Sequence, residues 1–237
     1  MRIAGRGHRR IIALCVALAV SIPGFALSVD EVDVDASFLL VFTVPPTGYG
    51  TASPANAQLI GASLPLRIAG PFFVEPVIEL FGMPYEWTDT NATAVPTRIE
   101  AAGEFFTLGA LISLQAGVSF PLAPVVAIGG ALGLDFLLRF PLDFTNTDPT
   151  SISGRQPALG YFFSAGRFFY PETRLFVRWH ISQPVDLVLN VRAFYPLFHA
   201  WDGLGQPFID QFMMSAGLGF AIRLRPAAET SAPTGSK

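Results

Sequence analysis

Apolar residues alternate with small, polar or charged residues along much of the chain. Between Val126 and Phe140 the even positions are apolar or glycine, whereas the odd positions are mostly small and include Asp135 and Arg139. A period of two places successive side chains on opposite faces of a β-strand, whereas a helix would scatter these residues around its circumference. The same sorting recurs in residues 106–119, 173–181, 185–195 and 211–224. The pattern predicts strands that have one apolar face and one polar or small face.

Segments of about ten residues that alternate in this way are typical of transmembrane β-barrels. We predict strands near residues 36–44, 58–69, 73–85, 104–119, 124–140, 171–181, 185–196 and 211–225. Residues 157–170 leave an alternative open, because they either extend an outer hairpin or form a further strand that leads to ten. The predicted fold is therefore an all-β, closed, antiparallel, up-and-down transmembrane β-barrel of eight strands, with ten strands as the alternative.

The links between the predicted strands differ at the two ends of the hairpins. Short proline-bearing links occur at Ala69-Gly70-Pro71, at residues 120–124 and at Ser182-Gln183-Pro184, whereas polar loops span residues 45–56, 88–103 and 145–156. Outer-membrane barrels have short periplasmic turns and longer outer loops. The short links are therefore expected to face the periplasm.

Composition supports a membrane protein. Hydrophobic residues make up 51% of the chain and charged residues only 14%, whereas soluble domains carry about 25% charge. The formal net charge of -3 gives no electrostatic basis for binding nucleic acid. The glycines within residues 105–134 disfavour membrane-spanning helices, since each glycine costs about 1 kcal/mol in a helix.

The first 26 residues have the pattern of a secretory signal peptide. A basic head at Arg2, Arg6, Arg9 and Arg10 precedes an apolar run that ends before Pro23, which is shorter than the roughly 20 apolar residues of an anchor helix. We predict cleavage after Ala26. The expected domains are a signal peptide (1–26), a transmembrane β-barrel (27–225) and a disordered periplasmic tail (226–237), in a protein exported to the bacterial outer membrane.

On this alternation and turn placement, the chain resembles the small eight-stranded outer-membrane barrels of diderm bacteria. That group includes the transmembrane domain of OmpA and the OmpX and OmpW types. The resemblance covers nearly the whole mature chain and is architectural. One departure is that such barrels often end on an aromatic residue, whereas Phe220 is followed here by Ile222, Leu224 and the tail.

Strand parity places a set of charged residues on the inner face. The lumen-facing charges are expected to be Arg67, Glu75, Glu79, Asp135, Arg139, Arg174, Arg178, Asp186, Arg192 and Arg223. Eight strands leave room inside only for side chains, and buried charges need partners. We therefore expect a lumen filled by ion pairs. The surplus of two arginines would favour an anionic ligand or waters if the lumen were open.

Asp135 and Arg139 are about 13 Å apart along a strand, at roughly 3.3 Å per residue, so each needs a partner on another segment. We expect an arginine beside Asp135, and an acid or a loop carbonyl beside Arg139. Nearer the membrane interfaces, aromatic residues predict a girdle. They are Tyr85, Trp87, Phe140, Phe144, Tyr195, Phe198 and Trp201.

No catalytic residue, metal site or cofactor site is predicted. His8 leaves with the signal peptide, His180 is expected to be a hydrogen-bonded core residue, and His199 stands beside Trp201 and Asp202 without a serine nucleophile in a recognisable motif. The expected function is a non-enzymatic, surface-exposed structural or interaction protein. One alternative is a narrow channel for small solutes or hydrophobic molecules, and a second is a lipid-modifying enzyme. We expect a monomer in contact with outer-membrane lipid, and no nucleic-acid partner.

Overall fold

The computed structural model describes residues 28–29, 31–44, 54–89, 92–97, 104–142, 149–203, 205 and 207–224. The predicted signal peptide (1–26) and tail (226–237) lie outside these residues, as does Phe144 of the predicted girdle.

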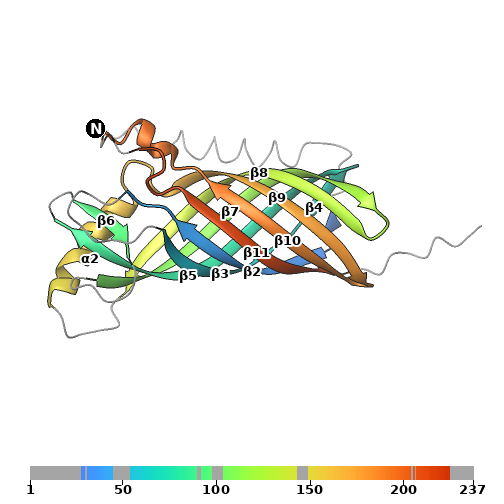
Figure 1. Cartoon of the computed structure of the whole chain (residues 1–237), viewed down its shortest axis with the longest axis horizontal. Helices are drawn as coiled ribbons and strands as arrows, with labels where there is room; N and C mark the ends of the chain where they lie inside the picture. The colour runs from blue at the N-terminus through green and yellow to red at the C-terminus, as the bar shows by residue number, and fades with distance from the viewer. Residues whose placement is uncertain are drawn as a thin grey trace, which may run out of the picture.

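Eight antiparallel strands form a closed barrel (Figure 1). Because β11 pairs with β2, and β5 pairs with both β3 and β7, the sheet has no open side. The eight-stranded prediction is confirmed. The barrel strands are β2 (Glu31–Val41), β3 (Ala55–Ser63) continued by β4 (Leu66–Ala69), β5 (Phe72–Thr88), β7 (Glu104–Ala123), β8 (Val126–Leu142), β9 (Phe169–Ser182), β10 (Val185–Phe194) and β11 (Met213–Arg223).

Shorter elements decorate the barrel. Strand β1 (Ser28–Val29) pairs with β4, and β6 (Thr93–Pro96) pairs with the last residues of β5. Helix α2 (Pro149–Phe162) precedes β9, and a 3-10 helix, η1 (Leu197–Ala200), follows β10. None of the helices in the described ranges is long and apolar enough to cross a bilayer.

Helix α2 contains residues 157–162 of the stretch left open by the sequence, and β9 begins at Phe169. Ala158, Tyr161 and Phe162 are buried, and this i, i+3, i+4 spacing puts them on one helical face. The further strand, and with it the ten-stranded alternative, is therefore wrong. The loop expected at residues 145–156 already contains the first turns of α2, which begins at Pro149, a residue well suited to the first position of a helix.

The outer surface of the barrel is an apolar belt. Leu132 and Leu175 expose 68% and 70% of their surface. Soluble monomers rarely expose continuous apolar areas of this kind, so the belt faces lipid. Other belt residues are Val34, Phe38, Ile60, Ile78, Leu80, Leu108, Ile112, Leu114, Leu134, Phe136, Val177, Leu189, Val191, Leu218 and Phe220.

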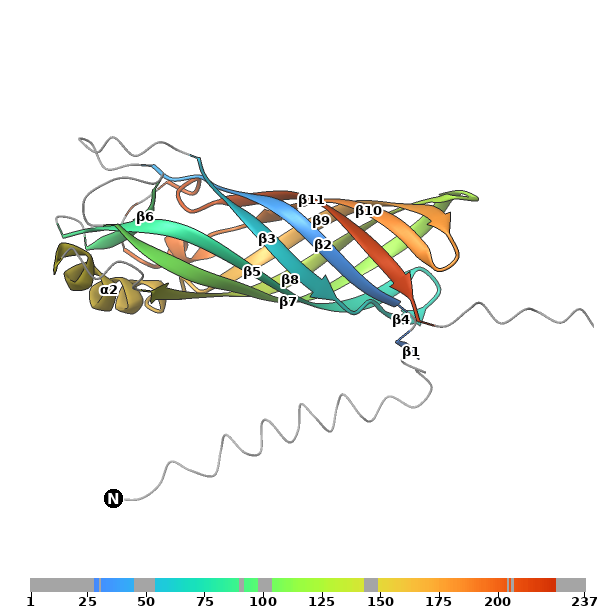
Figure 2. The same ribbon diagram turned by 90° about the horizontal axis from the view of Figure 1, so that it is seen from below.

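Tight turns gather at the end of the barrel where β2 begins and β11 ends (Figure 2). The turns are Gly70-Pro71, Pro124-Val125 and Gln183-Pro184, and they confirm the short links predicted there. At the second link the strand continues to Ala123, so the turn is shorter than predicted. Gly70 has a φ of +55°, a left-handed conformation that glycine adopts without steric cost.

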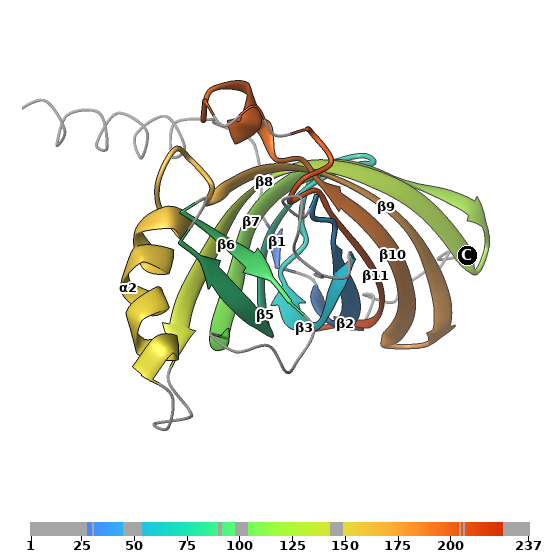
Figure 3. The same cartoon turned by 60° about the vertical axis from the view of Figure 1, so that its left-hand side comes forward.

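The opposite rim is uneven. Pairing between β5 and β7 continues to Glu86–Glu104, whereas the β8–β9 ladder ends at Phe136–Phe169. Strands β5, β7 and β8 therefore form a wall that extends past β9, and α2 contacts this wall and β6 (Figure 3). The wall and the helix together cover one side of the barrel opening at the end with the long loops.

Candidate functional site

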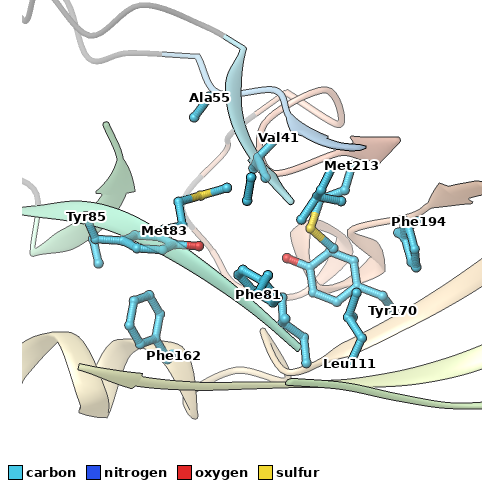
Figure 4. Close-up of a cluster of buried hydrophobic side chains, with 14 of the residues drawn as sticks. Val41, Ala55, Phe81, Met83, Tyr85, Leu111, Phe162, Tyr170, Phe194 and Met213 are labelled. Carbon is cyan, nitrogen blue, oxygen red and sulfur yellow. The ribbon is translucent and has the colours of Figure 1, made fainter. Parts of the chain in front are cut away.

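The half of the lumen nearest the long loops is filled by apolar side chains. We call this cluster the outer plug (Figure 4). Its residues are buried on the inner sides of the strands, on α2 and on η1, so the predicted polar inner face holds mainly in the other half. The outer plug comprises Leu39, Val41, Ala55, Leu59, Phe81, Met83, Tyr85, Phe105, Leu111, Leu137, Tyr161, Phe162, Tyr170, Phe194, Phe198 and Met213.

Two residues of the outer plug correct the predicted aromatic girdle. Tyr85 and Phe198 are buried inside the protein instead of lying at a lipid interface. Phe162 of α2 meets the Tyr85 ring edge-on at a centroid distance of 5.1 Å. The helix therefore supplies aromatic partners that strand parity alone could not reveal.

Arg139 of β8 lies beside the end of α2 and the loop that follows this helix. Its Nη2 donates a hydrogen bond to the carbonyl oxygen of Arg167 at 2.8 Å, and its guanidinium stands 4.3 Å from the centroid of the Phe162 ring. This agrees with the prediction that an acid or a loop carbonyl would lie beside Arg139. The contact ties the strand wall to the segment that follows α2.

Arg192 organises the middle of the lumen. It is ion-paired with Glu79, with Glu172 at 2.5 Å (Nε to Oε1) and with Asp135 at 3.6 Å (Nη2 to Oδ1). The prediction that an arginine would lie beside Asp135 is confirmed. All four side chains are buried, so the cluster closes the lumen below the outer plug.

Glu172 is a functional-site residue that the sequence reading missed. The alternation was followed only from residue 173, although residues 172, 174 and 178 share one parity of β9 and face inward together. Ser113 donates a hydrogen bond to its carboxylate at 2.9 Å, and Gln115 donates another at 3.0 Å. Gln115 in turn accepts a hydrogen bond from Arg174, which is ion-paired with Glu75 at 2.9 Å.

A third group of charges lies nearer the tight turns. Arg178 pairs with Glu31 at 2.6 Å and with Asp33 at 3.3 Å. Asp186 contacts His180 at 2.7 Å and Arg223 at 3.0 Å. The sequence reading missed Glu31 and Asp33 because it began the first strand at residue 36, although the same alternation continues back to residue 31.

The expected surplus of positive charge in the lumen is wrong. Glu31, Asp33, Asp35 and Glu172 join the four predicted acids, so six arginines face eight acids in the described part of the barrel. Arg67 is exposed and lines a cavity at the mouth. Acidic side chains therefore outnumber arginines on the inner face.

Two cavities follow one another from the end with the tight turns. The mouth cavity is lined by Arg67, Phe73 and Phe176 among others. The mid-lumen cavity is lined by Asp33, Asp35, Asn190 and Arg192, and both cavities share Glu75 and Arg174. The Arg192 cluster and then the outer plug lie beyond them, so these cavities form a polar pocket that is blind toward the long loops.

Inward aromatic rings narrow the mouth cavity. Phe73 and Phe176 meet edge-on at a centroid distance of 5.8 Å. Gly117 makes this possible, because a Cβ atom there would lie 2.5 Å from the tip of the Phe73 ring. Small inward residues thus give the rings space to lie across the lumen.

A separate polar network joins the loops at the far rim. Arg167 is ion-paired with Asp202 at 3.3 Å, and the two ring nitrogens of His199 contact Asp202 at 3.1 Å and the Asp210 carbonyl at 2.7 Å. Burial raises the pKa of Asp210, despite the hydrogen bond that it accepts from the Val44 amide. Both nitrogens of His199 are thus engaged in holding loops together.

Within the described residues, no group of three or more His, Cys, Asp or Glu side chains is arranged to hold a metal ion. His180 contacts Asp186 at the opposite end of the barrel from His199. The two histidines therefore belong to different networks. In the network of His199, Ser164 accepts a hydrogen bond from Arg167 at 2.8 Å, whereas the two ring nitrogens of His199 contact Asp202 and the Asp210 carbonyl.

Comparison with known proteins relates the chain to others by fold. No protein-family model matches it, and neither does any curated protein sequence. Among solved structures, it is similar to Neisserial surface protein A (NspA), with a TM-score of 0.51, 12% identity and coverage of 84% of this chain and 99% of that one.

Two further solved structures have lower scores. The attachment invasion locus protein Ail of Yersinia pestis has a TM-score of 0.43 and 11% identity, with coverage of 83% of this chain and 100% of that one. The outer membrane protein AlkL has a TM-score of 0.41 and 12% identity, with coverage of 89% and 97%. The fold is thus that of the small eight-stranded outer-membrane β-barrels.

Proposed function

We propose that the protein is a non-enzymatic, non-conducting barrel of the bacterial outer membrane that acts through its outer rim. The observation that carries this proposal is the double closure of the lumen. Buried ion pairs around Arg192 block the middle, and the outer plug fills the half beyond it. A hydrated ion has no described path through both layers.

The outer rim supports a role in interaction. Loop residues 195–212 expose Leu197, Trp201, Phe208 and Ile209. The same loop is held in place, since Trp201 donates a hydrogen bond to the carbonyl oxygen of Ala165 at 2.8 Å and Asp202 is ion-paired with Arg167. Exposed apolar groups on a fixed loop are typical of a surface that meets partners.

Conductance in planar bilayers tests the closed lumen. Refolded protein that shows heat-dependent mobility on gels should insert without giving single-channel currents. Phe81→Ala and Tyr170→Ala open the outer plug, and Arg192→Met removes the guanidinium of the cluster that blocks the middle of the lumen. The variant with all three changes should conduct. A lipid-face control, Leu175→Ala, should stay silent. Steady currents from the unaltered protein would contradict the proposal.

Adhesion of bacteria that display the protein tests the outer rim. Cells should be retained on surfaces coated with protein from the host or environment, and a variant with Trp201→Ser, Phe208→Ser and Ile209→Ser should lose retention at equal surface amounts. A Leu159→Ser control changes an exposed apolar residue of α2, away from this loop. Equal retention by all variants and by cells without the protein would refute the interaction role.

One observation favours a second candidate function, a conduit for hydrophobic molecules. Within the described residues the β3–β5 ladder ends at Leu59–Phe81, and the inner residues beside the end of this ladder are apolar. A disulfide between Ala57→Cys and Met83→Cys would fasten this seam. If vesicles that contain the protein take up a hydrophobic dye through this seam, the disulfide should stop the uptake and a reductant should restore it. Uptake that the disulfide leaves unchanged would exclude the seam.

A further inference from the structure

Strand β8 continues past β9 at the end of the barrel with the long loops. The β8–β9 ladder ends at Phe136–Phe169, whereas β8 itself runs to Leu142. Helix α2 lies on the inner side of this extension, because Phe162 contacts the inward residues Tyr85 and Arg139. The chain that leaves α2 therefore passes the edge of β8 that β9 leaves uncovered.

Phe163, directly after α2, contacts the outward side of β8 at this edge. Its ring centroid lies 6.2 Å from that of Phe140 and 6.3 Å from that of Phe168. Phe140 has the outward parity of the belt residues Leu132 and Phe136, and Phe163 and Phe140 expose 39% and 45% of their surface. The exposed side of the chain at the end of α2 is therefore continuous with the lipid-facing belt.

Leu159 extends this apolar surface along α2. Its exposure is 41%, and the amide of Phe163 donates a hydrogen bond to its carbonyl oxygen at 3.3 Å. This i, i+4 spacing puts the two side chains on one stripe of the helix, apart from the buried face that contacts the outer plug. Residues 156–166 contain no charged side chain. Helix α2 therefore has an uncharged, apolar outer stripe as well as an apolar inner face.

The height of Phe140 places this surface at the outer border of the lipid. Trp179 lies opposite Val126, and it marks the border near the tight turns, because tryptophan is enriched at membrane interfaces. From Ile128, the next outward residue of β8, Phe140 is about 40 Å along the strand at roughly 3.3 Å per residue, or about 30 Å across the membrane at a tilt of about 40°. The apolar band of such barrels is about 25 Å tall and has aromatic girdles at both borders. Phe140 and the Phe163 ring that it contacts therefore lie in the outer girdle.

We propose that Leu159, Phe163 and Phe140 form a lipid anchor, which contacts the outer leaflet of the membrane and thereby holds α2 over the barrel opening. Lipid is favoured over a soluble protein as the occupant, because the surface continues the belt and carries no charged side chain. Helices that lie in a membrane interface bury an apolar face at the boundary between headgroups and acyl chains. The lipid anchor does not rest on the proposed role of loop residues 195–212, which expose a separate group of side chains.

Collision rates of nitroxide spin labels test the lipid anchor. Cys15 is the only cysteine of the chain and lies in the predicted signal peptide, so the refolded mature protein (27–237) can carry one label at a time in phosphatidylcholine vesicles. Labels at Leu159→Cys and Phe163→Cys should collide more with oxygen, which concentrates in lipid, than with a nickel chelate, which stays in water. Their oxygen-to-chelate ratios should lie nearer to that of Leu132→Cys in the belt than to that of Asp89→Cys, an exposed position outside the barrel.

A label on the other flank of α2 is the matched control. Pro157 is exposed and, two residues before Leu159 at about 100° per residue, lies on nearly the opposite side of the helix. A label at Pro157→Cys should be reached by the chelate. Free access of the chelate to labels at residues 159 and 163, or a lipid-like ratio at residue 157, would overturn the proposal. Spin–spin broadening at residue 163 would also overturn it and would assign the surface to a second copy of the chain.

Hydrogen exchange in the same vesicles tests whether the lipid anchor holds α2. Leu159→Ala with Phe163→Ala removes most of the apolar surface but keeps helix propensity, since alanine is the best helix former. The amides of residues 158–162 should exchange faster in this variant, whereas Leu159→Met with Phe163→Met, which stays apolar, should retain their protection. Heat-dependent mobility checks that each variant is folded. Equal protection in the alanine pair and in the unaltered protein would refute the holding role.

Discussion

Replacing Arg192 with methionine is the most direct test of how the lumen is held together. The change keeps a long side chain but removes the guanidinium that pairs with Glu79, Asp135 and Glu172. These carboxylates are buried, with exposures of 0% for Glu79 and Asp135 and 2% for Glu172. The variant would leave three acids without their shared cation.

The expected loss can be estimated from buried ion pairs in other proteins. Removing one partner of such a pair costs about 3–5 kcal/mol, since the remaining charge stays buried. Arg139→Gln is the matched control, because the partners of Arg139 are a carbonyl oxygen and an aromatic ring. Its cost should be about 1–2 kcal/mol, the loss of one hydrogen bond without a stranded acid.

Denaturant titration in lipid vesicles measures both free energies of unfolding by linear extrapolation. Tryptophan fluorescence and the mobility shift on heating supply two independent probes. Adding Glu172→Gln to Arg192→Met should recover part of the loss, because it removes one stranded charge. If Arg192→Met costs no more than Arg139→Gln, the ion pairs do not stabilise the lumen and the reasoning fails.

Three further predictions address the belt, the glycines and the rim. Leu132→Arg, on the lipid face, should lower the free energy of unfolding in vesicles by about 2–4 kcal/mol, and an unchanged value would mean that the two faces of β8 are assigned the wrong way round. Gly117→Ala should lower the free energy of unfolding by about 1–3 kcal/mol in the same assay, because its Cβ would meet the Phe73 ring. Gly160→Ala on α2 adds a Cβ that meets no atom within 4 Å, so it should stabilise the helix by about 0.5–1 kcal/mol. The opposite order of the two effects would contradict the described packing. Because burial raises the pKa of Asp210, the stability that its protonated form gives is lost as pH rises through that pKa. Protection of the amides of residues 207–212 from hydrogen exchange should therefore fall over this range, and Asp210→Asn should flatten the pH dependence. Protection that rises with pH would refute this prediction.

Strand parity accounts for much of the candidate site. It placed Glu79, Asp135 and Arg192 on inner faces, where the structure joins them in one cluster. It missed Glu31 and Asp33 because the first strand was started five residues too late, and it missed Glu172 because the alternation was followed only from residue 173. The alternation itself predicts an inward position for all three residues, since each continues the two-residue period of its strand.

The outer plug could not be predicted in the same way. Inner positions such as Leu111 and Leu137 alternate normally within their own strands, and nothing in their spacing says that they meet at one level of the barrel. Their grouping depends on strand register and on the position of α2, whose residues 149–162 interact with strands β5 to β8. These are contacts between distant segments, which a local pattern does not encode.

The sequence by itself determined the barrel, because a two-residue period must place one face of each strand toward lipid and the other inward. It also determined where the tight turns occur, because glycine and proline restrict the backbone locally. Only the tertiary structure decided which charges meet. Pairing depends on how strands far apart in the sequence align around a closed sheet: Arg178 reaches Glu31 across 147 positions of the chain, a distance over which the local pattern holds no information.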